Sequence, residues 1–202
     1  MNYIDEIKQE VECREISLLY HFTPFENVRS ILINGLASRE ILEKHEISYV
    51  ATDEMRLDGR LNGLSLSIHS INWSMFRAKK LQYLCEWAIL ELDSSILWTH
   101  ECRFCWANAA SREILKHRGF RGGPWALRKM FEDRIGIGGS VREKYSLLDH
   151  MPTDEGAEVQ VLNIISPELI KTVIVGSEKS KSEAENIVRD SGMAISVCVE
   201  NL

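Results

Sequence analysis

The sequence predicts an α+β fold in which helices flank a mixed or antiparallel central β-sheet. Two observations support this prediction. The amphipathic helical segments gather early and in the middle of the chain, and most strand-like segments are separated by irregular stretches rather than by regular helical crossovers. The 202 residues contain no internal repeat and no low-complexity linker. We therefore expect residues 1–202 to form a single domain.

Short strands and amphipathic helices alternate through the first half of the chain. Apolar residues alternate with serine at 64–68, which is typical of a half-buried strand. Residues 25–32 carry apolar side chains at helical spacing, and Asn34-Gly35 ends that helix. The expected elements are a helix over 2–13, a strand over 17–22 that Pro24 interrupts, helices over 25–32 and 38–44, a strand over 64–68, a helix over 73–80 and a strand over 86–92.

The second half of the chain is richer in strands. A proline in the first turn supports a helix over 124–132, and Gly192 closes a helix over 180–191. The other expected elements are a helix over 111–116 and strands over 158–165, 169–175 and 194–199.

The composition indicates a soluble globular protein, because 45% of the residues are hydrophobic and 27% are charged. No apolar run approaches the ~20 residues that a membrane-spanning helix needs. Residues 1–15 are polar and acidic, unlike a secretory leader. The five cysteines are scattered and odd in number, which favours reduced thiols. We therefore expect a cytoplasmic protein without a membrane partner.

The net charge of −6 argues against a general binder of duplex nucleic acid but allows a short local contact. Such a contact is predicted over residues 112–129, where basic residues are interleaved with Phe120 and Trp125 against a single acid, Glu113. Unpaired bases stack on aromatic rings while phosphates need cations. A solvated helix face is the alternative. The candidate contact residues are Arg112, Lys116, Arg118, Arg121, Trp125 and Arg128.

No metal site is expected. His100, Cys102 and Cys105 could supply ligands, but a structural zinc site needs four ligands, usually as two spaced pairs, and no second Cys-x-x-Cys exists. Buried free thiols are the favoured interpretation. The glycine-rich run at 136–140 lacks the lysine of a phosphate-binding loop and is expected to be a flexible loop.

Two polar residues at strand ends are candidates for sugar chemistry. His21 ends the first strand beside a helix start, where a neutral imidazole can bond a ribose hydroxyl. Glu158 opens an alternating strand, so it shares one face with Gln160. A carboxylate in this position can hold a sugar hydroxyl and stabilise positive charge on an anomeric carbon. Taken alone, each residue is better explained as structural, as a turn histidine or a solvated acid.

Together these two segments resemble the DarT family of DNA ADP-ribosyltransferase toxins. The stretch from Tyr20 to Leu36 resembles the family's opening Tyr-His-[Ile/Phe]-Thr strand and the following helix, and 157–161 with 167–170 resembles its catalytic Ala-Glu-x-x-Val strand and sequel. Glu54-Met55-Arg56 matches the place of the family's arginine, although Arg60 lies close by. The resemblance spans residues 18–176. It departs at 62–76, where the prolines common in the family are missing.

The resemblance implies an ADP-ribosyltransferase-like fold, with NAD⁺ as the substrate and no metal. Glu158 and Arg56 would be catalytic. Glu158 would grip the nicotinamide ribose, and Arg56 would orient the phosphates or the incoming base, because its pKa above ~12 makes it a poor base. The expected NAD⁺-contacting residues are His21, Phe22, Thr23, Gly35 and Arg56.

The resemblance also implies partners. The protein would attach ADP-ribose to a nucleobase of single-stranded DNA as the toxin of a toxin–antitoxin system, with a macrodomain-type hydrolase as its antitoxin. Thymine and guanine are both open as the modified base. The alternatives are transfer to RNA or protein, plain NAD⁺ hydrolysis, and a catalytically inactive nucleic-acid-binding module.

Overall fold

A computed structural model describes residues 2–52 and 62–202 of the chain. Arg56, predicted both as a catalytic and as an NAD⁺-contacting residue, and its alternative Arg60 lie outside the described residues.

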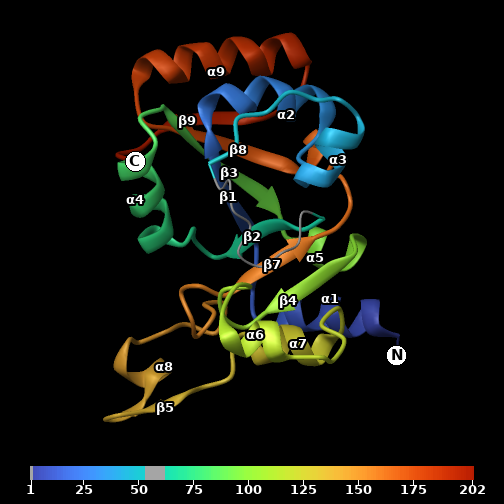
Figure 1. Ribbon diagram of the computed structural model, residues 1–202, viewed down its shortest axis with the longest axis vertical. Coiled ribbons are helices and arrows are strands. Elements are labelled where there is room, and N and C mark those ends of the chain that lie inside the picture. Colours follow the sequence, from blue (N-terminus) through green and yellow to red (C-terminus); the bar gives the residue numbers. More distant parts are fainter. Residues whose placement is uncertain (1, 53–61) are drawn as a thin grey trace.

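A seven-stranded sheet runs through the molecule in the order β4-β7-β2-β1-β3-β8-β9 (Figure 1). Neighbouring strands are antiparallel, except that β8 and β9 are parallel. The predicted α+β class with a mixed sheet is therefore confirmed. The strands are β1 (Leu18–Pro24), β2 (Leu64–Ile68), β3 (Trp87–Asp93), β4 (Cys102–Cys105), β7 (Glu158–Val161), β8 (Ile170–Val175) and β9 (Ser196–Val199).

Helices cover both faces of this sheet. Helices α2 and α9 lie side by side over one face, where their apolar side chains join the main buried cluster (Figure 1). A second cluster, centred on Phe76 of α4 and on Trp87, covers the other face. The helices are α1 (Tyr3–Cys13), α2 (Val28–Asn34), α3 (Arg39–Lys44), α4 (Trp73–Gln82), α5 (Ile96–Thr99), α6 (Arg112–Lys116), α7 (Pro124–Lys129), α8 (Val141–Lys144) and α9 (Glu178–Ser191), with short 3₁₀ turns at Phe25–Asn27 and Pro167–Leu169.

Local signals explain where the helices begin and end. The side chains of Asn2, Asn72, Ser111 and Ser177 each accept a backbone N–H in the first turn of α1, α4, α6 and α9, respectively. These caps satisfy donors that a helix start leaves without partners. Gly192 ends α9 in the left-handed conformation.

The structure corrects several of the expected elements, among them the strand expected over 158–165, which ends at Val161 as β7. Strand β1 continues through Pro24, which is its last residue, where a missing N–H is tolerated. The glycine-rich run expected to be a flexible loop forms a hairpin of β5 (Ile135–Gly136) and β6 (Gly139–Ser140), which projects from the body with α8 (Figure 1). Strand β4 and helix α5 were not expected.

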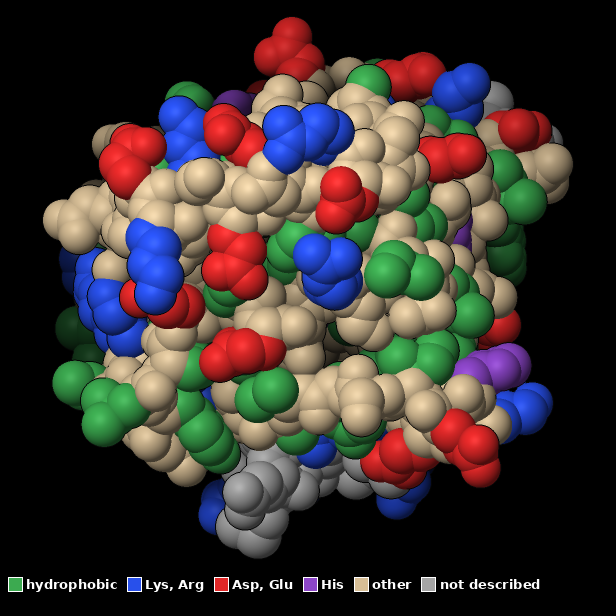
Figure 2. Space-filling model, turned by 90° about the horizontal axis from the view of Figure 1, so that it is seen from above, with side chains coloured by type: hydrophobic (Ala, Val, Ile, Leu, Met, Phe, Trp, Pro, Cys, Tyr) green, Lys and Arg blue, Asp and Glu red, His purple; other side chains and the backbone are tan. Residues whose placement is uncertain are grey.

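The surface above α2, α3 and α9 carries acidic and basic side chains interspersed (Figure 2). Nucleic acids are attracted by fields of a single sign, which clustered cations provide. This face therefore does not have the charge pattern of a nucleic-acid contact.

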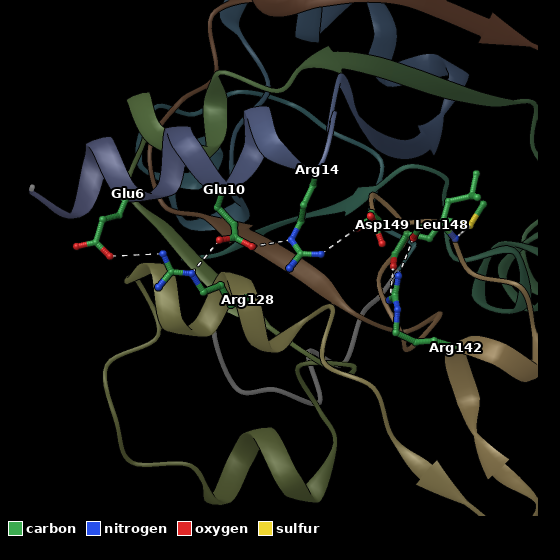
Figure 3. Close-up of polar contacts among 8 residues, drawn as sticks. Glu6, Glu10, Arg14, Arg128, Arg142, Leu148 and Asp149 are labelled. Carbon is green, nitrogen blue, oxygen red and sulfur yellow. Dashed lines mark hydrogen bonds and ion pairs between the residues drawn. The ribbon is translucent and has the colours of Figure 1, made fainter.

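Helix α1 is fastened to α7 through an acidic pair of residues (Figure 3). Arg128 donates from Nε to Glu10 at 2.8 Å and lies 3.5 Å from Glu6. Arg14 donates to the other oxygen of Glu10 at 2.7 Å and also to the carbonyl oxygen of Asp149 at 3.1 Å. Arg128 was expected to contact nucleic acid, but its guanidinium is occupied in joining α7 to α1.

The ion pairs of Arg14 and Arg128 with Glu10 make the stability of the fold depend on pH. Partial burial favours the neutral acid, but hydrogen bonds from Arg128 and Arg14 prevail and hold the pKa of Glu10 below its ordinary value of 4.5. A lowered pKa in the folded state adds stability that is present above the ordinary value and is lost as pH falls through the folded value. We expect Glu10→Gln to lower the thermal midpoint at pH 7, and the gap to the unmutated protein to close as pH falls below the ordinary pKa of 4.5 and through the lowered one.

Glu12→Gln is the matched control, because Glu12 lies on the same helix and only pairs with Lys8 at 3.9 Å in an exposed position. Exposed pairs contribute roughly 0–1 kcal/mol. A gap between Glu10→Gln and the unmutated protein that stayed constant from pH 7 to pH 3 would contradict the role given to the charge of Glu10.

Candidate active site

A cavity of about 430 Å³ lies where β1 and β2 part. These strands pair only at two positions, Leu19 with Ile68 and Tyr20 with Ser67. Beyond Tyr20, β1 stays paired with β3 and β2 stays paired with β7. Clefts of several hundred Å³ are the usual size of small-molecule sites. We call this place the β1–β2 fork.

The walls of the cavity come from segments far apart in the chain. They are 20–24 of β1, the α2–α3 connection, 49–52, 63–67 of β2, the start of α4, the turn 108–110 and residues 156–158. His21 and Glu158 therefore line the same cavity. This is the arrangement that the sequence-based hypothesis required.

His21 is fixed at the wall by β2. Its Nδ1 lies 3.0 Å from the carbonyl oxygen of Ser65. A carbonyl oxygen only accepts hydrogen bonds, so the ring donates from Nδ1, and in the neutral ring Nε2 carries the lone pair. The strand positions explain this contact, because β2 runs beside β1 at the β1–β2 fork without a continuous ladder.

Thr23 and Asn27 hold another wall. Thr23 is buried, and its Oγ1 accepts from Asn27 Nδ2 at 2.9 Å. The same amide donates to the carbonyl oxygen of Val50 at 2.9 Å, and the N–H of Val50 donates back to Asn27 Oδ1 at 2.8 Å. Asn27 thus ties the segment at Val50 to the first strand. Thr23 was predicted from the sequence as a residue of the site, whereas the hydrogen bonds of Asn27 were not.

Phe22 and Gly35 border the cavity but have packing roles. The ring of Phe22 packs at 5.3 Å from Phe76 and 5.9 Å from Trp87 in the second buried cluster. Gly35 has φ +87°, and a Cβ there would lie 2.6 Å from Ile164 Cγ2 and 2.7 Å from the carbonyl oxygen of Ile165. Only glycine fits this conformation and this close approach.

Glu158 is the first residue of β7 and is half-buried. Its Oε1 accepts the backbone N–H of Ala109 at 2.6 Å. Ala109 belongs to the turn that follows β4, and β4 pairs with β7 so that Cys105 lies opposite Glu158. A charge-assisted bond from a backbone donor fixes the carboxylate more firmly than a mobile side chain would.

Arg134 fastens the two turns on either side of Glu158. Its Nη1 donates to Asp154 Oδ2 at 2.6 Å, and its Nη2 donates to the carbonyl oxygen of Trp106 at 2.7 Å. Asp154 Oδ1 in turn accepts the N–H of Gly156 at 2.8 Å. One guanidinium therefore joins the turn that carries the Ala109 donor to the turn that leads into Glu158. Arg134 was not among the residues predicted from the sequence.

A second arginine orders the chain before this turn. Arg142 donates to the carbonyl oxygen of Leu148 at 2.7 Å (Figure 3). It also donates to the carbonyl oxygen of Met151 at 2.9 Å and to Thr153 Oγ1 at 3.0 Å. The irregular approach to β7 is thus held by side-chain donors instead of by a ladder.

The predicted nucleic-acid-contacting residues fall into different environments. Arg121 is only 7% exposed, and its guanidinium donates to Cys105 Sγ, so it is not available at the surface. Arg128 is bound to α1, as described above. Arg112, Lys116 and Arg118 are exposed, and Trp125 is partly exposed. Arg121 and Arg128 are therefore no longer candidates for contact with nucleic acid.

The thiols considered for zinc are buried. Burial raises the pKa of Cys102 to about 12, and the nearby Glu101 adds to this effect. Within the described ranges, no three histidine, cysteine or acidic side chains gather in a way that could hold a metal ion. None of the described helices is both long and apolar enough to cross a bilayer.

Comparison with known proteins identifies the family. The family model of DarT, described as a single-stranded DNA thymidine ADP-ribosyltransferase, matches residues 20–201. The chain belongs to the DarT family. It is therefore an NAD-dependent ADP-ribosyltransferase by family, and the predicted family and enzyme class are confirmed. The search of curated proteins gives no significant match.

Solved DarT structures share the fold at low sequence identity. The DarT of Thermus sp. 2.9 in complex with NAD⁺ is 14% identical with a TM-score of 0.61, and the match covers 93% of this chain and 96% of that one. The same protein in complex with ADP-ribosylated single-stranded DNA has a TM-score of 0.58 at 14% identity, over 93% and 95%. DarTG of Thermosipho africanus in complex with ADP-ribose is 16% identical with a TM-score of 0.55 and is matched over 92% of this chain. This chain spans only 50% of that one.

Proposed function

We propose that this DarT-family enzyme transfers ADP-ribose from NAD⁺ to a thymine base of single-stranded DNA. The observation that carries the proposal is the shared cavity of His21 and Glu158 at the β1–β2 fork. The family description supports thymine over guanine as the acceptor base. Cleavage of the nicotinamide–ribose bond needs a negative group beside C1′ and an environment that holds the ribose still.

The proposed reaction balances without a further reactant. The bond between ribose C1′ and nicotinamide breaks, and its electron pair leaves with nicotinamide, which departs neutral. The positive charge shifts to an oxocarbenium at C1′, which the carboxylate of Glu158 stabilises. Thymine N3 attacks C1′, because N1 already carries the deoxyribose, and the N3 proton is released.

The other residues position the substrates. His21, whose ring is fixed by the carbonyl oxygen of Ser65, binds the ribose of the adenosine. Thr23 lines the neighbouring part of the cavity and contacts the bound dinucleotide there. The Ala109 N–H keeps the Glu158 carboxylate turned in one direction. Arg56, or Arg60 in its place, orients the NAD⁺ phosphates or the incoming base. Phe22 and Gly35 shape the wall. In the proposed DNA-contacting set we keep Arg112, Lys116, Arg118 and Trp125.

The decisive experiment incubates the purified protein with NAD⁺ and a panel of single-stranded oligonucleotides. Each oligonucleotide of the panel lacks one of the four bases, and mass spectrometry detects the gain of one ADP-ribosyl group. We expect modification of every oligonucleotide except the one without thymine. Modification only of RNA or protein, release of nicotinamide without any acceptor, or modification only where guanine is present would each overturn the proposal. The absence of any turnover would instead support an inactive binding module.

We also propose the wider setting that the family implies. Modified template bases block replication, so the enzyme acts as a toxin in the cytoplasm beside an antitoxin, a macrodomain-type hydrolase that removes the mark. Residues 1–202 act as one catalytic domain. Co-expression with such a hydrolase is expected to restore growth that expression of this chain alone arrests.

A positioning role for Arg134 gives a separate expected result. We expect Arg134→Gln to lower kcat by about 10–100-fold, because a displacement of Glu158 by about 1 Å has effects of this size. The KM for NAD⁺ should change little. Stability should also change little, because the side chains of Arg134 and Asp154 are 40% and 29% exposed and such pairs are weak.

Arg134→Lys should give an intermediate kcat, because an ammonium group keeps the pair with Asp154 but cannot also reach the carbonyl oxygen of Trp106. Arg128→Gln is the matched control, since it breaks an arginine–carboxylate pair of similar exposure that touches neither turn. A rise in the KM for NAD⁺ at constant kcat would contradict the positioning role.

A further inference from the structure

We propose that Tyr3, Phe120 and Trp125 form a stacking platform for unpaired bases that flank the modified nucleotide. This platform is a binding subsite separate from the cavity at the β1–β2 fork. The inference rests on the proposed function, because it gives the single-stranded substrate a second point of attachment.

The three rings are exposed to an unusual degree for their size. Tyr3 is 61% exposed, Phe120 is 66% exposed and Trp125 is 41% exposed. The rings of Tyr3 and Phe120 are stacked, with centroids 6.4 Å apart and planes 24° from parallel. Large aromatic side chains outside the core mark binding surfaces more often than isolated aliphatic ones do. Every nucleobase has a face that can stack on such rings.

The platform is held in position before any ligand arrives. Trp125 Nε1 donates to the carbonyl oxygen of Phe120 at 3.0 Å. The indole of Trp125 also packs 5.7 Å from Trp106 and 5.4 Å from His117. Preorganised rings lose little entropy on binding, so stacking energy appears as affinity.

The chain around the platform supplies cations for the phosphates. Lys116 and Arg118 precede Phe120 and are exposed. Among the salt bridges of the described residues, none involves Arg112, Lys116 or Arg118. On the Phe120 side of the platform the charge is therefore complementary to a phosphate backbone, although α1 on the Tyr3 side carries Asp5 and Glu6 and the whole chain is acidic. This combination of rings and cations favours single-stranded DNA over a protein partner as the occupant.

The platform is continuous with the reaction cavity along the chain. Ala109 and Ala110 line the cavity, and Ser111 then caps α6, whose last turn leads to Phe120. Tyr3 reaches the platform from α1, which packs on α7. The family model matches residues 20–201, so Tyr3 of α1 is the one platform residue that lies outside the matched segment.

The test measures how catalytic efficiency depends on the length of the DNA. Thymine-containing oligonucleotides of increasing length are compared, and the quantity of interest is the ratio of kcat/KM for the longest to that for the shortest one modified. We expect this ratio to be about 10 or more for the unmutated protein, as stacking of one or two bases allows. Phe120→Ala and Tyr3→Ala should bring the ratio close to one.

Two variants separate stacking from structural damage. Phe120→Trp keeps a stacking ring and should keep the length dependence, whereas Phe120→Leu should lose it. Tyr145→Ala is the matched control, because Tyr145 is 62% exposed and lies outside the platform. If a ring substitution lowered kcat/KM by the same factor at every oligonucleotide length, the ring would have a merely structural role. That result would overturn the proposed stacking platform. An unchanged ratio in Phe120→Ala also overturns it. Failure of the proposed function looks different, because the unmutated protein would then modify none of these oligonucleotides at thymine.

Discussion

Glu158→Gln is expected to lower the rate of ADP-ribose transfer by about 10²–10³-fold or more, the range seen when a transition-state electrostatic contact is removed. Glutamine has the same shape, and its amide oxygen can still accept the Ala109 N–H that Glu158 accepts at 2.6 Å. The substitution therefore removes the negative charge that would stabilise the oxocarbenium and keeps the bond from the Ala109 N–H. Nicotinamide release and the mass gain of the oligonucleotide measure both halves of the reaction, and the thermal midpoint of unfolding checks that the fold is intact.

Glu155→Gln is the control for this experiment. Glu155 lies in the same turn, but its carboxylate accepts the N–H and hydroxyl of Ser74 at the start of α4. We expect it to keep most of the activity. If Glu155→Gln and Glu158→Gln were equally impaired, the general charge of the turn would matter rather than the carboxylate of Glu158.

Gly35→Ala is expected to lower the free energy of unfolding by about 3 kcal/mol or more, the sum of a strained φ and a core overlap. The added Cβ would stand 2.6 Å from Ile164 and 2.7 Å from the backbone of Ile165. Leu36 and Ile165 exchange backbone hydrogen bonds at 3.0 and 2.9 Å, so the chain cannot move away without breaking them. Thermal unfolding should show a midpoint lower by roughly 6–12 °C for a chain of this size.

Gly192→Ala separates the overlap from the backbone strain. Gly192 also has a positive φ, +72°, but no atom lies within 4 Å of the added Cβ. Its replacement should cost only about 1 kcal/mol, the usual cost of the left-handed conformation for alanine. Equal destabilisation by the two substitutions would show that packing at Gly35 contributes nothing.

The main strands and helices could be predicted from the sequence, and so could two residues, His21 and Glu158, that line one cavity. Alternating serine and apolar residues marked β2, and the amphipathic pattern marked α2, because these periodicities depend only on neighbours along the chain. His21 and Glu158 could be singled out because each lies in a motif typical of the DarT family. The family match over residues 20–201 bears out that resemblance.

Side-chain environments could not be predicted in the same way. Arg121 was expected on a nucleic-acid surface with its basic neighbours, but it is buried against Cys105. Arg128 is engaged with Glu10 of a distant helix. Charge patterns along the chain do not reveal which cations find partners far away. Strand β4 was missed because three of its four residues are buried, so the alternation that identifies a strand is weak.

The sequence by itself determined the α+β class and the family, and it singled out two residues, His21 and Glu158, that line one cavity. Only the tertiary structure decided how Glu158 is held, through the Ala109 N–H and the guanidinium of Arg134. A backbone donor has no side chain to recognise, and a guanidinium that bridges two turns becomes visible only when the chain has folded. Local patterns follow from the periodicity of the backbone, whereas these contacts depend on which segments the sheet brings together.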